Sequence, residues 1–382
     1  MSDAELITDL DGLAALTDGW DALAAENGLP HLAPAWVLAW WHHVPSPETV
    51  PRTIAVRDGD ELIGLAPLAV TPGSGRIDYR VPGIEIAGRL APLARAGREW
   101  EVAEAIGETL AAADPRPDAL ILEGTPLAAH WPTALRDGWP GALRPPLRRW
   151  HVDSAPFVAL REPSFDAWLA ARSSNFRQQM RRLRRGFAAA GGSSRVSTHA
   201  TLAADAAAFV RLHTSRWDGR GASNLAALGD RFAALLVEAG EPLLADGRLS
   251  VRVLELDGEP VCIQVFLAAG GHVLFVNGGW DERHAKLKPS LVCLLEAVEE
   301  AFARGAEKLD LGVGEQPYKL RFADGGDPLG WMMLLPPGPR LPLTAARSAP
   351  ALLRAGARDA ALRALPPEQL ERLRTLGRRS GG

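Results

Sequence analysis

The chain of 382 residues has little cysteine, tyrosine or methionine, with only 2, 2 and 4 copies of each. Two cysteines cannot build a disulfide framework, and Cys262 and Cys293 both lie in apolar runs, so we expect buried thiols. The sequence has no CxxC or HExxH motif, and the adjacent His42 and His43 would point apart on a helix. It also has no P-loop and no GxSxG motif. Without these motifs, the sequence does not indicate a metal site, an NTPase site or a serine-hydrolase site.

The charge is nearly balanced, with 42 basic and 46 acidic residues and a net charge of −4. This balance gives no reason to expect binding to nucleic acid by the whole molecule. No apolar run approaches the roughly 20 residues of a membrane span. The acidic N-terminus lacks the apolar region of a signal peptide. We therefore expect a cytoplasmic protein with no membrane span, and the sequence does not indicate its oligomeric state.

The most regular pattern lies in the second half of the chain, where three antiparallel strands precede a loop, a helix and a further strand. The expected ranges are 249–256, 261–267, 272–276, 289–304 and 307–311, with the last strand running on towards residue 319. Asp257-Gly258 is a hairpin turn signal, and Pro289 suits the first position of a helix. This order places a helix N-terminus at one end of a sheet, where a pyrophosphate can bind.

The first half contains a fainter copy of this pattern. Strands are expected at 52–57 and 61–70 around Asp58-Gly59, with a helix at 99–113 and a strand at 118–124. We interpret the copy as an internal duplication, and chance similarity of two ordinary units is the alternative. Further helices are expected at 13–27, 34–43, 164–190, 202–216 and 224–238, and a strand at 151–160. We predict units at 1–147 and 148–335, followed by a Pro/Ala/Arg-rich tail at 336–382 that is partly helical.

Several motifs in this order resemble the GNAT acyltransferase superfamily, and within it the branch described as BioF2-like or CelD-like. The resemblance covers roughly residues 10–335. It is carried by the tryptophans Trp20, Trp36, Trp40 and Trp41, by Ser174-Asn175-Phe176-Arg177, by His213 to Trp217 with Arg220-Gly221, by the Asp257-Gly258 hairpin, and by the segment Gly312 to Lys319. It implies an α+β fold of two GNAT-like units in tandem, with mixed, mostly antiparallel sheets flanked by helices.

The resemblance further implies N-acyl transfer from acetyl-CoA or another acyl-CoA to a small-molecule amine, with no metal. The acceptor expected from the branch is a cell-envelope or polysaccharide precursor. Two alternatives remain open. A Fem-like aminoacyltransferase shares the tandem fold but needs a basic surface for aminoacyl-tRNA, and the sequence offers one basic helix and no long helical arm. The other alternative is a non-catalytic accessory protein of polysaccharide synthesis.

The predicted catalytic residues lie around the Gly312-x-Gly314 motif. Tyr318 would protonate the departing thiolate or hydrogen-bond the thioester, although it would equally suit a half-buried anchor of the last strand. An attacking amine must lose a proton, and Asp310 and Glu315 are the nearest carboxylates. Asp310 lies in an apolar strand, where burial would raise the pKa of its carboxyl group. Strand alternation gives even odds that its side chain faces the site.

The loop before the second-half helix departs from the superfamily pattern for pyrophosphate, Arg/Gln-x-x-Gly-x-Gly/Ala, because residues 283–290 contain no glycine. Lysine charge and backbone donors would replace the glycines. The predicted cofactor-binding residues are Gly278, Gly279, Lys286, Lys288 and Ser290.

Six arginines at 172–185 have almost no acidic neighbour in the sequence, so a bound anion and a merely solvated helix face remain equally open. The predicted substrate-binding or anion-binding residues are Arg177, Arg181, Arg216, Arg220 and Lys319.

Overall fold

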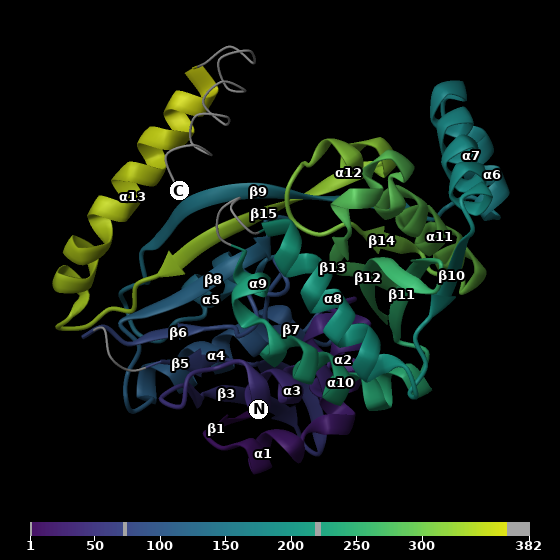
Figure 1. Ribbon diagram of the computed structural model, residues 1–382. Helices are drawn as coiled ribbons and strands as arrows, with labels where there is room; N and C mark the ends of the chain where they lie inside the picture. The colour runs from purple at the N-terminus through teal and green to yellow at the C-terminus, as the bar shows by residue number, and fades with distance from the viewer. Residues whose placement is uncertain (1, 72–74, 218–222, 365–382) are drawn as a thin grey trace.

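The computed structural model describes residues 2–71, 75–217 and 223–364. It contains an α+β fold with two sheets flanked by helices, as predicted (Figure 1). The larger sheet has eleven strands in the order β10 (Gly192–Val196), β11 (Leu249–Leu256), β12 (Glu259–Ala269), β13 (His272–Trp280), β14 (Lys308–Asp310), β9 (Leu147–Ala159), β15 (Gly325–Leu334), β8 (Ala119–Pro126), β6 (Asp78–Arg80), β5 (Ala69–Val70) and β2 (Val50–Pro51). The smaller sheet has the order β1 (Asp3–Ile7), β3 (Thr53–Asp58), β4 (Glu61–Ala66) and β7 (Leu93–Ala94).

The long strands β9 and β15 join the two halves of the chain into one sheet. β9 pairs with β14 of the second half, and β15 pairs with both β9 and β8, which belongs to the first half. The sequence did not predict β15, because its glycines and Pro328 are residues that strands disfavour. Pro328 is tolerated because the pairing with β8 begins only at the next residue, Leu329. The division into units at 147 and 148, at the start of β9, stays a prediction.

Several predicted helices are interrupted. The expected helix at 164–190 is two helices, α6 (Phe165–Ala171) and α7 (Ser174–Ala189). The break occurs because Arg172 is extended and the hydroxyl of Ser173 accepts a hydrogen bond from the Phe176 N–H, which starts a new helix. The remaining helices are α1 (Leu10–Ala14), α2 (Thr17–Glu26), η1 (Pro30–Leu32), α3 (Pro34–His43), α4 (Glu99–Ala112), α5 (Trp131–Asp137), α8 (Leu202–Trp217), α9 (Asn224–Leu228), α10 (Asp230–Ala245), η2 (Glu282–Leu287), α11 (Pro289–Ala303), α12 (Pro317–Phe322) and α13 (Leu341–Ala364).

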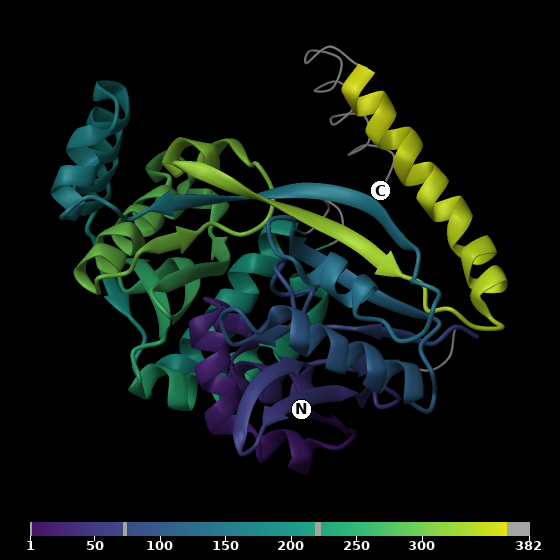
Figure 2. The same ribbon diagram turned by 180° about the vertical axis from the view of Figure 1, so that it is seen from behind.

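Two large apolar clusters lie on the two faces of the sheet. One contains the first half together with α8 and α10, and includes the fully or nearly fully buried Trp20, Trp36, Trp40 and Trp41. The four tryptophans therefore pack in the core. The other cluster lies between the second-half strands and α6, α7 and α11. Figure 2 shows α6 and α7 at one end of the molecule and α13 at the other. Among the described residues, no helix is both long enough and apolar enough to cross a bilayer.

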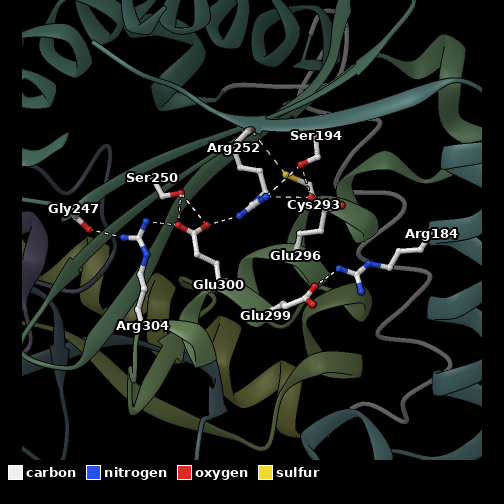
Figure 3. A network of polar contacts seen from close by, with 10 residues as sticks. All are labelled: Arg184, Ser194, Gly247, Ser250, Arg252, Cys293, Glu296, Glu299, Glu300 and Arg304. Carbon is white, nitrogen blue, oxygen red and sulfur yellow. Dashed lines mark hydrogen bonds and ion pairs between the residues drawn. The ribbon is translucent and has the colours of Figure 1, made fainter. Parts of the chain in front are cut away.

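A network of buried charges fixes α11 against β11 (Figure 3). Arg252 of β11 is 11% exposed and forms ion pairs with Glu296, at 3.1 Å, and with Glu300. Glu300 also accepts hydrogen bonds from Ser250 and pairs with Arg304. Because the carboxylates lie along α11 and their partner lies on β11, the neighbour of the edge strand β10, the network sets the position of the helix relative to the sheet.

Candidate active site

The strands β13 and β14 separate soon after they begin to pair. Their parallel register runs only from His272 opposite Lys308 to Leu274 opposite Asp310. β13 continues to Trp280, whereas the chain after β14 turns away through Gly312, which has a φ of 74°. On its other side, β13 has a bulge between Phe275 and Asn277. The separation leaves the second half of β13 without a strand neighbour on one side.

The N-terminus of α11 lies at this opening. Pro289 occupies the first helical position and Lys288 precedes it in the left-handed conformation, with φ 48° and ψ 53°. A left-handed residue other than glycine costs on the order of 1–3 kcal/mol, and such strain is often found at ligand sites. The first amides of a helix have no intrahelical partner, so the N–H of Ser290 is a donor directed out of the helix end.

A pocket of about 330 Å³ occupies the opening. It is lined by Arg216, Cys262, Gln264, Phe275, Asn277, Gly278, Gly279, Trp280, Ala285, Lys288, Ser290, Leu291 and Tyr318. Six of the predicted site residues are therefore brought together, namely Gly278, Gly279, Lys288, Ser290, Arg216 and Tyr318. Both cysteines are free and buried, as expected.

Tyr318 is positioned by a helix and not by the end of a strand, which corrects the prediction that the last strand runs on towards residue 319. Gly312 and Gly314 have φ values of 74° and 97°, which end the strand, and Pro317 starts α12. Burial raises the pKa of Tyr318 to about 12, and the nearby Arg216 only partly opposes this. The hydroxyl is consequently protonated at neutral pH and can donate a proton into the pocket.

Gly279 lets α8 approach β13 closely. A Cβ atom on Gly279 would lie 2.6 Å from the backbone N of His213 and 3.0 Å from the carbonyl carbon of Leu212. Burial lowers the pKa of His213, and Nδ1 of this neutral ring donates a hydrogen bond of 3.1 Å to the Gly278 carbonyl. The sequence placed His213 in a motif but gave it no role. In the structure it fastens α8 to the wall of the pocket.

Gln264 is a pocket residue that the sequence analysis missed. It is 2% exposed, and its Nε2 donates to the carbonyl of Ser290 at 3.0 Å. Because that carbonyl only accepts, the amide orientation is fixed. Its Oε1 is then buried without a partner among the described residues. A lone polar residue in the middle of the apolar strand 261–267 is the signal that would have found it.

Three predicted residues that follow the separation of the strands do not line the pocket. Lys319 is 5% exposed and its Nζ donates to the carbonyls of Gly312 and Val313, while burial lowers its pKa to about 8. Asp310 accepts a hydrogen bond from the Gly312 N–H and lines a different cavity. Glu315 is exposed. Among the described residues that line the pocket there is no carboxylate and no histidine.

The remaining predicted residues lie at or beyond the edges of the pocket. Lys286 is exposed on η2 and does not line it. Arg177 donates to the carbonyls of Ala170 and Arg172, so it closes the break between α6 and α7. Arg181 is exposed on α7. Arg220 lies outside the described residues. No group of three or more metal-ligating side chains occurs within the described ranges.

Comparison with known proteins agrees with this geometry. Residues 174–320 match the family model described as Acetyltransferase (GNAT) domain. The fold is similar to that of FemX, with a TM-score of 0.58, 11% identity and coverage of 87% of this chain and 97% of that one. It is also similar to the C-terminal DUF2156 domain of a proposed lysylphosphatidylglycerol synthetase from Agrobacterium fabrum, with a TM-score of 0.56, 11% identity and coverage of 92% and 97%. A conserved protein of unknown function from Bacteroides thetaiotaomicron has a TM-score of 0.52, 11% identity and coverage of 88% and 100%.

No curated protein sequence matches the chain. At identities of this size the structural likeness describes the fold alone. The match over residues 174–320 indicates a GNAT acetyltransferase domain in this part of the chain. The matched stretch contains every residue of the pocket beside β13.

Proposed function

We propose that the protein transfers an acyl group, in the first place acetyl, from acyl-CoA to a small-molecule amine. The observation that carries this proposal is the pocket at the separation of β13 and β14, which combines a helix N-terminus with the protonated hydroxyl of Tyr318. From the sequence we also propose that the protein belongs to the BioF2-like or CelD-like branch and is cytoplasmic. Its acceptor would come from cell-envelope or polysaccharide synthesis.

The donor would bind with its pyrophosphate at the first turn of α11. Ser290 offers a backbone N–H there, the helix dipole favours an anion, and Lys288 adds a positive charge at the pocket wall. This arrangement supplies charge where the usual glycines of the superfamily loop are missing. Lys286, exposed on η2, would contribute long-range attraction only.

The reaction would be a direct attack of the amine nitrogen on the thioester carbonyl carbon. As the carbon–sulfur bond breaks, Tyr318 would give its proton to the departing thiolate. A backbone N–H of β13 would stabilise the negative charge that develops on the carbonyl oxygen. The N–H of Gly278 is one such donor. It donates a hydrogen bond of 2.8 Å to Oδ1 of Asn277, and the carbonyl oxygen of the thioester would replace this acceptor.

The structure places the proposed acid, Tyr318, at the pocket, but it places neither of the carboxylates predicted to act as the base there. Asp310 is paired with Arg89 at 2.8 Å and faces another cavity, and Glu315 is exposed. Either carboxylate would have to act through an intervening water from outside the pocket. Their role stays a prediction, and replacement of Glu315 by Gln is its simpler test because this exposed side chain leaves no buried charge behind.

Calorimetric titration with acetyl-CoA and desulfo-CoA tests the donor. We expect micromolar affinity for both, reduced at least tenfold by Lys288→Gly and less by Lys286→Ala. Glycine keeps the left-handed backbone at position 288, so the first variant removes charge without adding strain. Failure of the wild-type protein to bind either compound would refute the acyl-CoA donor.

A Fem-type aminoacyl-tRNA donor is the alternative, and the likeness to FemX supports it at the level of fold. Transfer from aminoacyl-tRNA without binding of acyl-CoA would favour it. An accessory protein without catalysis would show turnover with neither donor.

A further inference from the structure

A second cavity, here called the inter-unit cavity, lies where the first half of the chain meets β13 and β14. Its volume is about 140 Å³. Four segments enclose it: the end of α2 with η1, the chain before β7, the chain between β8 and α5, and the paired parts of β13 and β14. Apart from Asp310, none of its lining residues has a part in the acyl transfer proposed above, and it shares no lining residue with the pocket of Tyr318.

His31 brings a buried hydrogen-bond acceptor to this cavity. The side chain is 3% exposed, and burial lowers its pKa to about 4, so the ring is neutral. Its Nε2 is hydrogen-bonded to the carbonyl of Arg89, which can only accept, so the proton lies on Nε2. Nδ1 therefore carries a lone pair, and it is buried with no partner among the described residues.

Arg89 brings a donor to the same cavity. Its Nη2 pairs with Asp310 at 2.8 Å and with Asp327 at 2.5 Å, while its Nε is buried with no partner among the described residues. A buried polar group left unpaired costs on the order of 1–3 kcal/mol. One acceptor and one donor that both lack partners among the described residues, on two residues that line the same cavity, indicate a ligand that supplies the complementary pair.

The charges around the cavity restrict the ligand further. Arg89 and Lys308 are the cations, and Asp310 and Asp327 are the anions that pair with them, with Lys308 2.5 Å from Asp327. Because the four charges are balanced, a ligand with a net charge would be left uncompensated in a largely buried site. A net-neutral molecule avoids that cost.

The walls of the cavity are held apart by tight backbone contacts. Gly28 has a φ of 61°, and a Cβ atom there would lie 2.1 Å from Nδ1 of His272. A Cβ atom on Gly270 would lie 1.8 Å from the carbonyl oxygen of Ala25. Since α2 and the β12–β13 turn already touch at these glycines, the two halves cannot approach further and the cavity is preformed.

We propose that the inter-unit cavity binds a small net-neutral molecule that donates a hydrogen bond to His31 Nδ1 and accepts one from Arg89 Nε. A volume of about 140 Å³ equals four to five waters at roughly 30 Å³ each, which limits the ligand to the size of a small amino acid or amide. Zwitterionic amino acids and primary amides share this chemistry.

The test is a binding series on the full chain without any CoA compound. Serine and acetamide each carry donor and acceptor and have no net charge, whereas acetate only accepts and ethylammonium only donates. We expect millimolar or tighter binding of serine or acetamide by calorimetry, and affinity at least tenfold lower for acetate and ethylammonium. Serine alone would identify the zwitterion as the ligand class, and acetamide alone the amide.

Two variants locate the site. Ala129 lines the cavity, and Ala129→Leu should fill it and reduce the affinity at least tenfold, whereas the exposed neighbour Ala128→Leu should leave it unchanged. His31→Phe should have the same effect as Ala129→Leu. Equal binding of all four compounds, binding of none, or binding that survives in Ala129→Leu would overturn the proposal and leave a cavity that holds water only.

Discussion

Replacing Tyr318 with phenylalanine separates a catalytic role of the hydroxyl from a structural one. Tyr318 lines the pocket, and burial raises the pKa of its hydroxyl to about 12, so this group stays protonated at neutral pH. Loss of a general acid typically reduces kcat by about 10²–10⁴, equivalent to about 3–6 kcal/mol of transition-state stabilisation at about 1.4 kcal/mol per tenfold. We expect this reduction in kcat for Tyr318→Phe, with little change in KM for the acyl-CoA.

The other tyrosine provides a matched control. Tyr79 is fully buried and does not line the pocket. Its hydroxyl donates a hydrogen bond of 2.8 Å to the Pro115 carbonyl. Tyr79→Phe should cost about 0.5–1.5 kcal/mol of stability in chemical denaturation and leave kcat unchanged. Tyr318→Phe should show the opposite pattern.

The assay is the release of free CoA thiol from acetyl-CoA with a panel of amines. With a pKa of about 12, Tyr318 also predicts no alkaline loss of activity from this group below about pH 11. Wild-type kcat in a normally folded Tyr318→Phe variant would show that the hydroxyl is not the general acid.

Three further outcomes follow from the structure. Gly279→Ala should destabilise the protein by about 1–3 kcal/mol because its Cβ would meet the α8 backbone, whereas Gly186→Ala, with open space around it, should not; thermal unfolding of the two compares them. Arg252→Met should cost about 3–5 kcal/mol in denaturant unfolding because it leaves buried carboxylates of α11 without their partner, and an unchanged stability would show that the network of Figure 3 is dispensable. The pKa of His31 is about 4 in the folded protein against about 6.5 unfolded, so the unfolded state binds more protons and stability should fall by about 3 kcal/mol between pH 6.5 and 4, a loss that His31→Phe should remove from the pH profile of unfolding.

Local sequence signals predicted local structure well. The Asp257-Gly258 hairpin has φ values of 53° and 79°, as its residue types require, and Pro289 begins α11 as expected. These elements are determined by neighbouring residues and by the periodicity of apolar side chains. For the same reason β12 and α11, which line the pocket, were found at nearly their observed ranges. The third strand was expected to end at residue 276, whereas β13 continues through the pocket residues to Trp280.

Contacts between segments that are distant along the chain could not be predicted from the sequence. β15 was missed because its stability comes from β8 and β9 on either side and not from its own residues. Asp310 had even odds of facing either side of its strand, and the choice depends on Arg89 in the other half of the chain. The arginines of α7 looked unpaired along the sequence, yet Arg184 pairs with Glu299 on α11. Side-chain partners set by tertiary packing cannot be read from spacing alone.

Binding of acyl-CoA in the pocket between β13 and the N-terminus of α11 can be measured by hydrogen exchange of the backbone amides with and without acetyl-CoA. We expect slower exchange within residues 277–291 and around Tyr318, with α7 unchanged. Protection confined to α7, or none at the first turn of α11, would contradict it.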